Sequence, residues 1–324
     1  MLAIFSLFLL TLLVITAAAA IQASNLFVSV MMMGIFSLLM AINFFLLDAA
    51  DVALTEAAVG AGISTVLFLG ALAYLNPHEH KHAPKRTLGL VLVSIGGLLM
   101  AYASFHAPEF GDSNAPTALH LTPWFMQTTA EQIDIPNVIT AILGSFRGYD
   151  TLGEVFVVFT AGIGVLFLLS SPKPASVSTP KMVGLRHYVI PRLVGRLLIP
   201  FIFLFGLYVQ FHGEYSPGGG FQAGALIAAS IILYALLEGQ DRALKAIPQT
   251  ALTILMCSGA LLYTLVGIAG LVNGGYFLDY SVLAEDSVVG QQMGIILIEA
   301  GVGMTVTGVL LKIFHAFVSR GQSQ

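Results

Sequence analysis

Long apolar runs dominate this sequence and limit what it can fold into. A helix needs about 20 apolar residues to cross the hydrocarbon core of a bilayer. Such runs cover residues 2–21, 26–47, 52–75, 88–106, 151–170, 194–212, 220–238, 248–272 and 288–313 of the 324. Charged residues make up 9% of the chain, against about 25% in soluble domains. The sequence therefore predicts an all-α, polytopic membrane protein with about nine transmembrane helices.

The basic residues are distributed unevenly over the connectors between these runs. Of the 13 lysines and arginines, all except Arg147 fall on one side of the predicted membrane, opposite most of the connector acids. Cytoplasmic connectors carry the excess of basic residues in membrane proteins. The sequence therefore predicts a multi-pass protein of the cell (inner) membrane, with its N-terminus outside and its C-terminus cytoplasmic. No basic residues precede the first run, so we interpret it as a retained span rather than a signal peptide.

The third run carries an acid among small residues. Segment Asp51–Gly70 begins with an acid and has Glu56 about one and a half turns inside, followed by Gly60 and Gly62. An acid within a spanning helix costs roughly 2.5–3.5 kcal/mol on insertion scales, and small residues let another helix approach closely. The pattern therefore favours ion or proton handling, to which Asp51 and Glu56 are assigned. The alternative for Glu56 is a hydrogen bond to a neighbouring helix.

Two more acids fall inside predicted spans. Glu299 lies close to the middle of its run, and Glu154 lies near the start of another. A carboxyl group buried in an apolar environment can take up and release a proton near physiological pH. Both are therefore candidates for ion or proton translocation. Glu154 also follows Thr151 at the spacing of a helix-capping box, and that alternative remains open.

The connector FHGEYSPGGGFQAG (211–224) joins the sixth and seventh runs. Its glycines and proline are typical of a tight, irregular turn in which backbone approaches backbone. The predicted structural residues are Pro217, Gly218, Gly219, Gly220 and Gly224, the last two forming a GxxxG pattern. His212 and Glu214 are candidates to accept protons or cations at the outer mouth of a path. The alternative interpretation is that this connector is a turn with a packing role alone and holds no site.

The other polar features indicate no chemistry. His78, His80 and His82 share their connector with two lysines and an arginine, which favours a solvated loop over a metal site. The chain has one cysteine, so an internal disulfide or a cysteine metal cluster is excluded. No nucleophile–base pair, zinc signature or nucleotide-binding loop appears. The sequence predicts no enzyme, metal site, cofactor or nucleic-acid partner. A stretch at 124–142 is amphipathic and is expected along the membrane surface.

Three stretches resemble known families. DVALTEAAVGAG (51–62) resembles the hydrogenase D-like domain, and FRGYDTLGEVFVVFTAGIGVLFLL (146–169) resembles the hydrogenase E-like segment. Both also occur near the C-terminus of the large subunit of Mrp-type sodium/proton antiporters. From about Arg192 to Phe317, with FHGEYSPGGGFQAGALIAASIIL (211–233), the chain resembles the MnhB/MrpB subunit of those antiporters.

The resemblance divides the chain into parts. It implies a four-helix D-like domain at 1–106, an outer connector with an E-like helix at 107–171, a linker at 172–184, and a four-helix MnhB/MrpB-like domain at 185–324. It also implies a π-bulge in the third span, at the place where the related complex I subunit carries one. Glu56 and Glu154 match acidic positions thought to line the family's ion or proton route.

The resemblance implies a place in a large inner-membrane assembly. The large antiporter-like domain is absent from this sequence, so partners would supply it, together with small membrane subunits, monovalent cations, protons and lipid. The leading hypothesis is a membrane subunit of a sodium/proton antiporter that contributes to translocation and assembly. The alternatives are a membrane subunit of an energy-converting hydrogenase or related respiratory complex, a part of an inorganic-carbon uptake assembly, and a passive adaptor.

Overall fold

The computed structural model describes residues 2–72, 86–109, 111–169 and 188–322. Within these ranges the regular elements are all helical, and nine spans are long and apolar enough to cross a membrane. They are α1 (Leu2–Gln22), α2 (Leu26–Leu46), a third built from α3 (Ala50–Thr55), η1 (Glu56–Ser64) and α4 (Thr65–Leu72), α5 (Arg86–His106), α8 (Gly148–Leu169), α9 (Val189–Phe211), α10 (Gly220–Glu238), α12 (Gln249–Val272) and α13 (Ser287–Gln322). The predicted fold class is confirmed. The three histidines of the 78–82 loop and the predicted linker at 172–184 lie outside the described residues.

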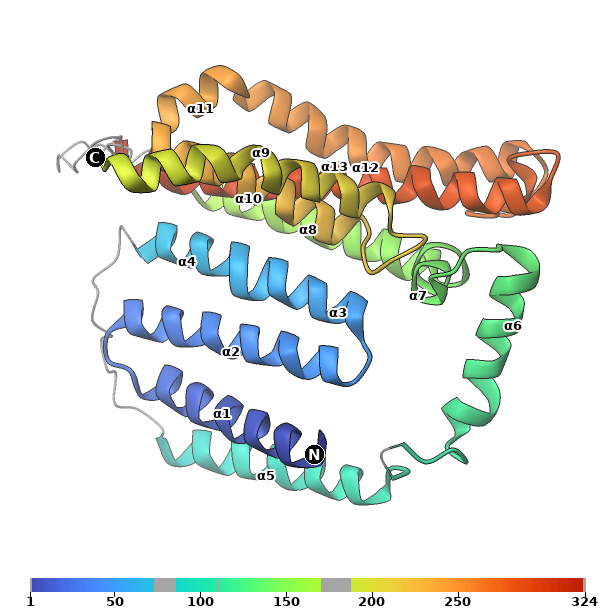
Figure 1. The fold of residues 1–324 in the computed structure, drawn as a ribbon, viewed down its shortest axis with the longest axis horizontal. Coiled ribbons are helices and arrows are strands. Elements are labelled where there is room, and N and C mark those ends of the chain that lie inside the picture. The colour runs from blue at the N-terminus through green and yellow to red at the C-terminus, as the bar shows by residue number, and fades with distance from the viewer. Residues whose placement is uncertain (1, 73–85, 110, 170–187, 323–324) are drawn as a thin grey trace.

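The spans form a bundle with a layer of helices beside it. Figure 1 shows α8, α9, α10, α12 and α13 packed together, with the third span, α2, α1 and α5 following outward in turn. Helix α13 packs against α12, α10 and α8, and it is the most deeply buried span of the chain. At the other extreme, α5 buries none of its spanning residues within the chain.

Glycines bring α10, α12 and α13 to backbone contact. A Cβ atom on Gly224 would lie 2.9 Å from the carbonyl oxygen of Gly303, and one on Gly259 would lie 2.5 Å from that of Gly301. A Cβ on Gly220 would overlap the carbonyl oxygen of Glu299. Small residues permit such close approach between membrane helices, where dispersion contacts supply much of the packing energy. This three-helix contact is the centre of the bundle.

The third span is interrupted by a nine-residue π-helix, η1. Pi-helical segments are rare and are often found at functional sites. Two glycines, Gly60 and Gly62, lie within it, and a Cβ on Gly60 would lie 2.5 Å from Oε1 of Glu56 and 2.9 Å from Oγ of Ser37 on α2. The absence of a side chain at Gly60 therefore makes room for the Glu56 carboxyl group. The π-bulge implied by the resemblance is present at the expected place.

The connector after α5 agrees with its predicted place along the membrane surface in its first half only. Helix α6 (Thr122–Gln132) runs across the direction of the spans (Figure 1), and Trp124 on it is exposed, as expected for a surface helix. The second half of the 124–142 stretch is instead folded into the bundle, where Ile133, Ile135 and Ala141 are buried. The chain turns inward at Ile133 and Asp134, where Gln292 of α13 donates hydrogen bonds to their carbonyl groups.

The two ends of the bundle differ in charge. One end, called the acidic end, carries the 47–49 turn, the 107–147 connector, the 212–219 loop and the 273–286 connector. The other, called the basic end, carries α11 (Gln240–Ala246) and the C-terminus (Figure 1). The described basic residues there include Arg192, Arg196, Arg242, Lys245 and Lys312.

A buried carboxylate organises the basic end. Glu238, the last residue of α10, is 1% exposed and accepts hydrogen bonds from three arginines. Nε of Arg192 lies 2.8 Å from its Oε1, Nη2 of Arg196 lies 2.7 Å from its Oε1, and Nη1 of Arg242 lies 2.7 Å from its Oε2. Buried charges are stable when they are paired and hydrogen-bonded. This cluster, which the sequence analysis did not identify, joins the start of α9 to α10 and α11.

The glycine contact between α10 and α13 gives a first testable expectation. We expect Gly220→Ala to lower the thermal stability of the protein, because overpacking a filled contact costs about 1–3 kcal/mol. Gly89→Ala is the matched control, because a Cβ on Gly89 of α5 meets nothing within 4 Å. Thermal denaturation in detergent, followed by size-exclusion chromatography, measures both. Equal melting temperatures for the two variants would contradict the assigned contact.

Candidate functional site

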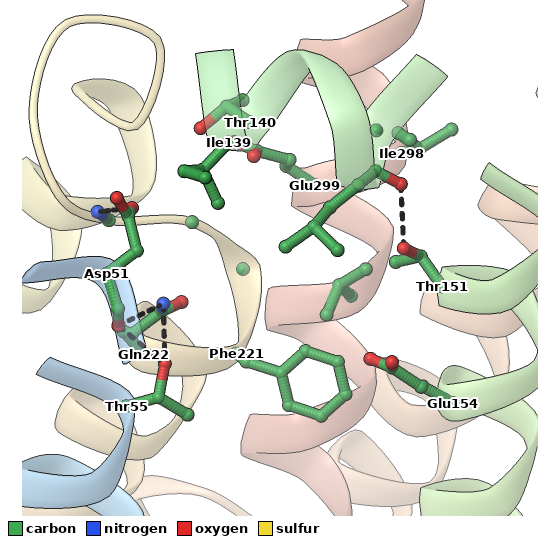
Figure 2. A pocket seen from close by; sticks show the side chains of 16 residues that line it. Asp51, Thr55, Ile139, Thr140, Thr151, Glu154, Phe221, Gln222, Ile298 and Glu299 are labelled. Carbon is green, nitrogen blue, oxygen red and sulfur yellow. Dashed lines mark hydrogen bonds between the residues drawn. The ribbon is translucent and has the colours of Figure 1, made fainter. Parts of the chain in front are cut away.

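A cavity of about 270 Å³ lies at the acidic end, between the third span, η3 (Ile142–Phe146), α8, α10 and α13. Its charged lining residues are Asp51, Glu154 and Glu299, all acidic. Figure 2 shows Asp51, Thr55 and Gln222 on one side of it and Thr151 and Glu154 on the other, with Phe221 between them. The cavity thus brings together acids that lie in three separate apolar runs of the sequence.

Asp51 fastens the 212–219 loop to the third span. Its Oδ1 accepts hydrogen bonds from the backbone N–H of Gly218 at 3.1 Å and from Nδ2 of Asn137 at 3.2 Å. A carboxylate that accepts two N–H groups is held in one orientation, and these charge-assisted bonds are stronger than neutral ones. The glycines of the loop allow its backbone to come this close. Asp51 therefore has a structural role in addition to its negative charge.

Asn137 and Thr140 hold the same loop from the opposite side. Asn137 caps α7 (Val138–Ala141) and donates to the carbonyls of Gly213 at 3.0 Å and Ser216 at 3.2 Å. The hydroxyl of Thr140 also donates to the Gly213 carbonyl, at 2.7 Å. The sequence analysis missed both residues. The available signal was the Pro–Asn pair at 136–137, which is typical of a helix start with asparagine as its N-cap.

The first turn of α10 is tied to the third span. Nε2 of Gln222 donates to Oγ1 of Thr55 at 2.7 Å, and Gln222 is buried. Thr55 directly precedes the π-helix, and its own hydroxyl donates to the carbonyl of Asp51. This contact places the start of η1 beside the cavity. Neither Thr55 nor Gln222 was singled out from the sequence.

Glu299 lies directly beneath the 212–219 loop. A Cβ on Gly213 would lie 3.2 Å from its Oε2, and one on Gly219 would lie 3.4 Å from its Oε1. Gly219 has a φ of 136°, a conformation available to glycine and strained for other residues. The carboxyl group of Glu299 is therefore level with the first turn of α10. This position is nearer to the acidic end than the central place of Glu299 in its apolar run indicates. The loop glycines leave the space that it occupies.

Glu154 faces the cavity from α8. The capping-box interpretation is wrong, because α8 begins at Gly148 and the hydroxyl of Thr151 donates instead to the Leu143 carbonyl, at 2.7 Å. Glu154 thus lies in the second turn of an established helix and is solvent-accessible in this chain. Two buried tyrosine hydroxyls fix this region, with Tyr263 donating to the carbonyl of Gly148 and Tyr280 to that of Gly144.

The two loop candidates differ in their surroundings. His212 stacks on Tyr208, with ring centroids 4.7 Å apart, and does not line the cavity. Glu214 has a buried Oε1 without a hydrogen-bond partner among the described residues. Its neighbour Gly213 packs against the carboxyl group of Glu299. Burial raises the pKa of Glu214 above its ordinary value.

The raised pKa of Glu214 predicts a pH-dependent effect. Because the pKa of Glu214 is higher in the folded protein, there is a pH range in which the folded protein binds a proton that the unfolded chain has already released. The free energy of unfolding therefore falls as the pH rises from the unfolded to the folded pKa of Glu214. We expect Glu214→Gln to leave the melting temperature nearly unchanged at about pH 5 and to raise it at about pH 8. Glu285→Gln, an exposed acid of the same end, is the control. A stabilisation that is the same at both pH values would show that ionisation of Glu214 is not its cause.

Glu56 does not line this cavity. Its carboxyl group lies against Gly60 and faces Ser37 of α2, on a different side of the third span from the bundle. The structure therefore divides the predicted translocation residues into three sets. Asp51, Glu154 and Glu299 share the cavity, Glu214 lies on the loop that covers Glu299, and Glu56 and His212 lie apart from the cavity.

Three families match successive parts of the chain. Residues 11–77 match MbhD, the D subunit of MBH, and residues 84–183 match MbhE, the E subunit of MBH. Residues 190–312 match MnhB, described as a "Domain related to MnhB subunit of Na+/H+ antiporter". The order of these matches is that expected from the sequence resemblance.

Individual relatives support the same assignment. A protein of Staphylococcus aureus (strain Newman) named "Putative antiporter subunit mnhB2" is 32% identical over 138 residues, which cover 42% of this chain and 96% of that protein. A protein of Rhizobium meliloti (strain 1021), named as the A/B subunit of a K(+)/H(+) antiporter, is 25% identical over 89% of this chain. The chain spans 31% of that relative and 66% of the uncharacterized protein MJ1307 of Methanocaldococcus jannaschii, to which it is 31% identical.

Two solved assemblies contain similar chains. A chain of the Mrp complex from Dietzia sp. DQ12-45-1b superposes on 96% of this chain with a TM-score of 0.75 and 27% identity, and 34% of that chain is covered. A chain of the membrane-bound sulfane sulfur reductase, an archaeal respiratory membrane complex, superposes on 72% of this chain with a TM-score of 0.54 and 28% identity. The chain is therefore a multi-pass inner-membrane protein that belongs to the MnhB family of Na+/H+ antiporter subunits, with MbhD-like and MbhE-like parts preceding the MnhB part.

Proposed function

We propose that this chain is a membrane subunit of a multisubunit monovalent cation/proton antiporter of the Mrp type, and that its acidic cavity forms part of the proton or cation path. The observation that carries the proposal is the cavity itself, whose three charged lining residues are all acidic and come from the MbhD-like, MbhE-like and MnhB-like parts. A binding route for positive ions thus forms where the three parts meet. A subunit that only joined other subunits would not require an acidic cavity of this kind.

The geometry supports a division of roles. Asp51 is held in one orientation by two hydrogen bonds and places a fixed carboxyl group on the cavity wall. Glu299 lies deeper, beneath the loop, where it is the candidate to load and release a proton. Glu154 faces the same space from α8 and is the candidate for the next step. Carboxylates facing a cavity inside a membrane protein commonly mark ion and proton pathways.

The proposed orientation places the acidic end outside the cytoplasm. The described basic residues of the other end favour the cytoplasmic side. The cavity then opens toward the outer face, and a partner subunit would continue the path inward. The large antiporter-like chain that the family resemblance implies is the proposed partner, together with small membrane subunits. In this role the chain carries out no bond chemistry of its own.

Two substitutions at Asp51 separate its charge from its hydrogen bonds. We expect Asp51→Asn to leave the complex assembled, because an amide oxygen still accepts from Gly218, and to lower sodium/proton exchange severalfold because the negative charge is lost. Asp51→Ala removes the acceptor as well and should also lower the amount of assembled complex. Exchange is measured as sodium-induced recovery of acridine-orange fluorescence in everted vesicles, and assembly by native gels. Full exchange in Asp51→Asn would argue against a role for this charge.

A second candidate function is a membrane subunit of an energy-converting respiratory complex. It is favoured by the matches to the two MBH subunits and by the structural similarity to the sulfane sulfur reductase chain, of which 99% is covered. Affinity purification of the tagged chain from its own membranes distinguishes the two. A large antiporter-like partner without iron–sulfur proteins supports the antiporter, and co-purifying iron–sulfur subunits support the respiratory complex.

A further inference from the structure

The basic end carries more guanidinium groups than its buried carboxylate neutralises. Arg192, Arg196 and Arg242 all pair with Glu238, and their side chains are 31%, 52% and 50% exposed. With the exposed Asp241 and Lys245 of α11, the described residues at the junction of α9, α10 and α11 include four positive and two negative side chains. The junction therefore keeps a positive charge that faces outward at the end of the spans.

An apolar groove begins directly beside these arginines. It lies between α9, α10 and α11, and its lining includes Pro200, Phe203 and Leu204 of α9, Ile231 and Tyr234 of α10, and Ala246 of α11. The groove has a volume of about 510 Å³ and is open on one side. Ser230 also lines the groove, but its hydroxyl already donates a hydrogen bond to the carbonyl of Ile227. The groove thus offers apolar surface and almost no polar partner.

The groove and the charges lie in the order that a phospholipid requires. Leu204 is eight residues beyond Arg196, so along the helix axis the groove reaches about 12 Å from the backbone of Arg196. One leaflet of the hydrocarbon core is about 15 Å thick. A ligand with an anionic head and an acyl chain would therefore meet the arginines at the membrane surface and the apolar groove below it. Basic pockets between membrane helices bind anionic lipid head groups in this way.

We propose that the junction of α9, α10 and α11 is a binding site for one anionic phospholipid. Arg196 and Arg242, the two more exposed arginines, contact the phosphate, and an acyl chain fills the groove between α9 and α10. Arg192, the least exposed of the three arginines, remains the partner of Glu238. The bound lipid would clamp the start of α9 to the end of α10. This site is at the opposite end of the bundle from the acidic cavity.

Native mass spectrometry of the complex that contains the chain tests the site. The complex is exposed to phosphatidylglycerol or to phosphatidylcholine in detergent, and the retained lipid is counted. We expect one retained phosphatidylglycerol, bound roughly 30-fold more weakly after Arg196→Gln with Arg242→Gln, because two basic contacts are lost. Excess inorganic phosphate should not displace it, since phosphate has no acyl chain. Equal retention of the two lipids by the unaltered complex would overturn the proposal.

Filling the groove provides a test that leaves the arginines intact. Ile231→Trp should abolish the retained phosphatidylglycerol, whereas the control Ile254→Trp, on an exposed face of α12, should keep it. A photo-crosslinking amino acid in place of Phe203 identifies the occupant directly, even where the arginine variants assemble poorly. A cross-link to phospholipid supports the site. A cross-link to a neighbouring protein subunit, or retention of the lipid by Ile231→Trp, contradicts it.

Discussion

Glu299→Gln should abolish coupled sodium/proton exchange while the complex remains assembled. The substitution removes the titratable proton but keeps the volume of the side chain beneath the 212–219 loop. No described hydrogen bond to the carboxylate is lost, and the contact between α10 and α13 uses the backbone of Glu299, which the substitution does not change. Exchange in everted vesicles across about pH 6–9, with native gels for assembly, measures the two properties separately.

Two comparisons make this test specific. Glu285→Gln, an exposed acid of the same end, should exchange like the unaltered protein. Glu56→Gln tests the π-helix acid, which lies outside the cavity, and we expect it to abolish exchange independently of Glu299. Full exchange in both Glu299→Gln and Glu56→Gln over the whole pH range would leave the passive adaptor as the function of this chain.

Glu238→Gln should reduce the amount of assembled complex severalfold. An amide can accept from one guanidinium group but cannot neutralise three, so the arginines of α9 and α11 would repel one another around an uncharged centre. The substitution also weakens the charge-assisted hydrogen bonds through which the buried Glu238 joins α9 and α11 to α10. Modest losses of stability change the abundance of a protein in the cell severalfold. Quantitative immunoblots of membranes and native gels measure the effect.

The neighbouring acid supplies the control for this prediction. Asp241→Asn removes one negative charge from the same end, but Asp241 is exposed, and we expect normal assembly. Adding Arg192→Gln to Glu238→Gln should restore part of the lost complex, because it removes one of the mutually repelling charges. Normal assembly of Glu238→Gln alone would show that the cluster contributes little to holding α9 against α10.

Much of the fold could be predicted because each span is a long apolar segment with a clear beginning and end. The nine spans, the acid-rich end and the glycine turn follow from hydrophobicity, charge placement and turn chemistry. The described basic residues other than Arg147 lie at one end, as their sequence positions predict. The largest error in length is at the last span, which continues to Gln322, because Phe314 and Val318 are buried and carry its apolar side past position 313.

The candidate site was less predictable, because it depends on contacts between distant segments. Asp51 and Glu299 are recognisable as acids within or beside apolar runs, but their common cavity requires the packing of the third span against α10 and α13. Asn137, Thr140 and Gln222 are ordinary polar residues in the sequence, and only the folded chain brings them to the loop or the third span. Glu238 was missed because it is the last residue of an apolar run and was not counted as buried.

The glycine contacts among α10, α12 and α13 determine which wall of the cavity is able to deform. Helices that touch through their backbones cannot slide without breaking many contacts at once, so these three should move as one stiff unit. The opposite wall contains a π-helix, and two of its links to α10 and the preceding loop are single hydrogen bonds, one donated by the Gly218 N–H to Asp51 and one by Gln222 to Thr55. A change in the charge of Glu299 would therefore displace the third span relative to an immobile bundle. We therefore expect α10, α12 and α13 to act as a fixed frame, with the third span taking up the movement.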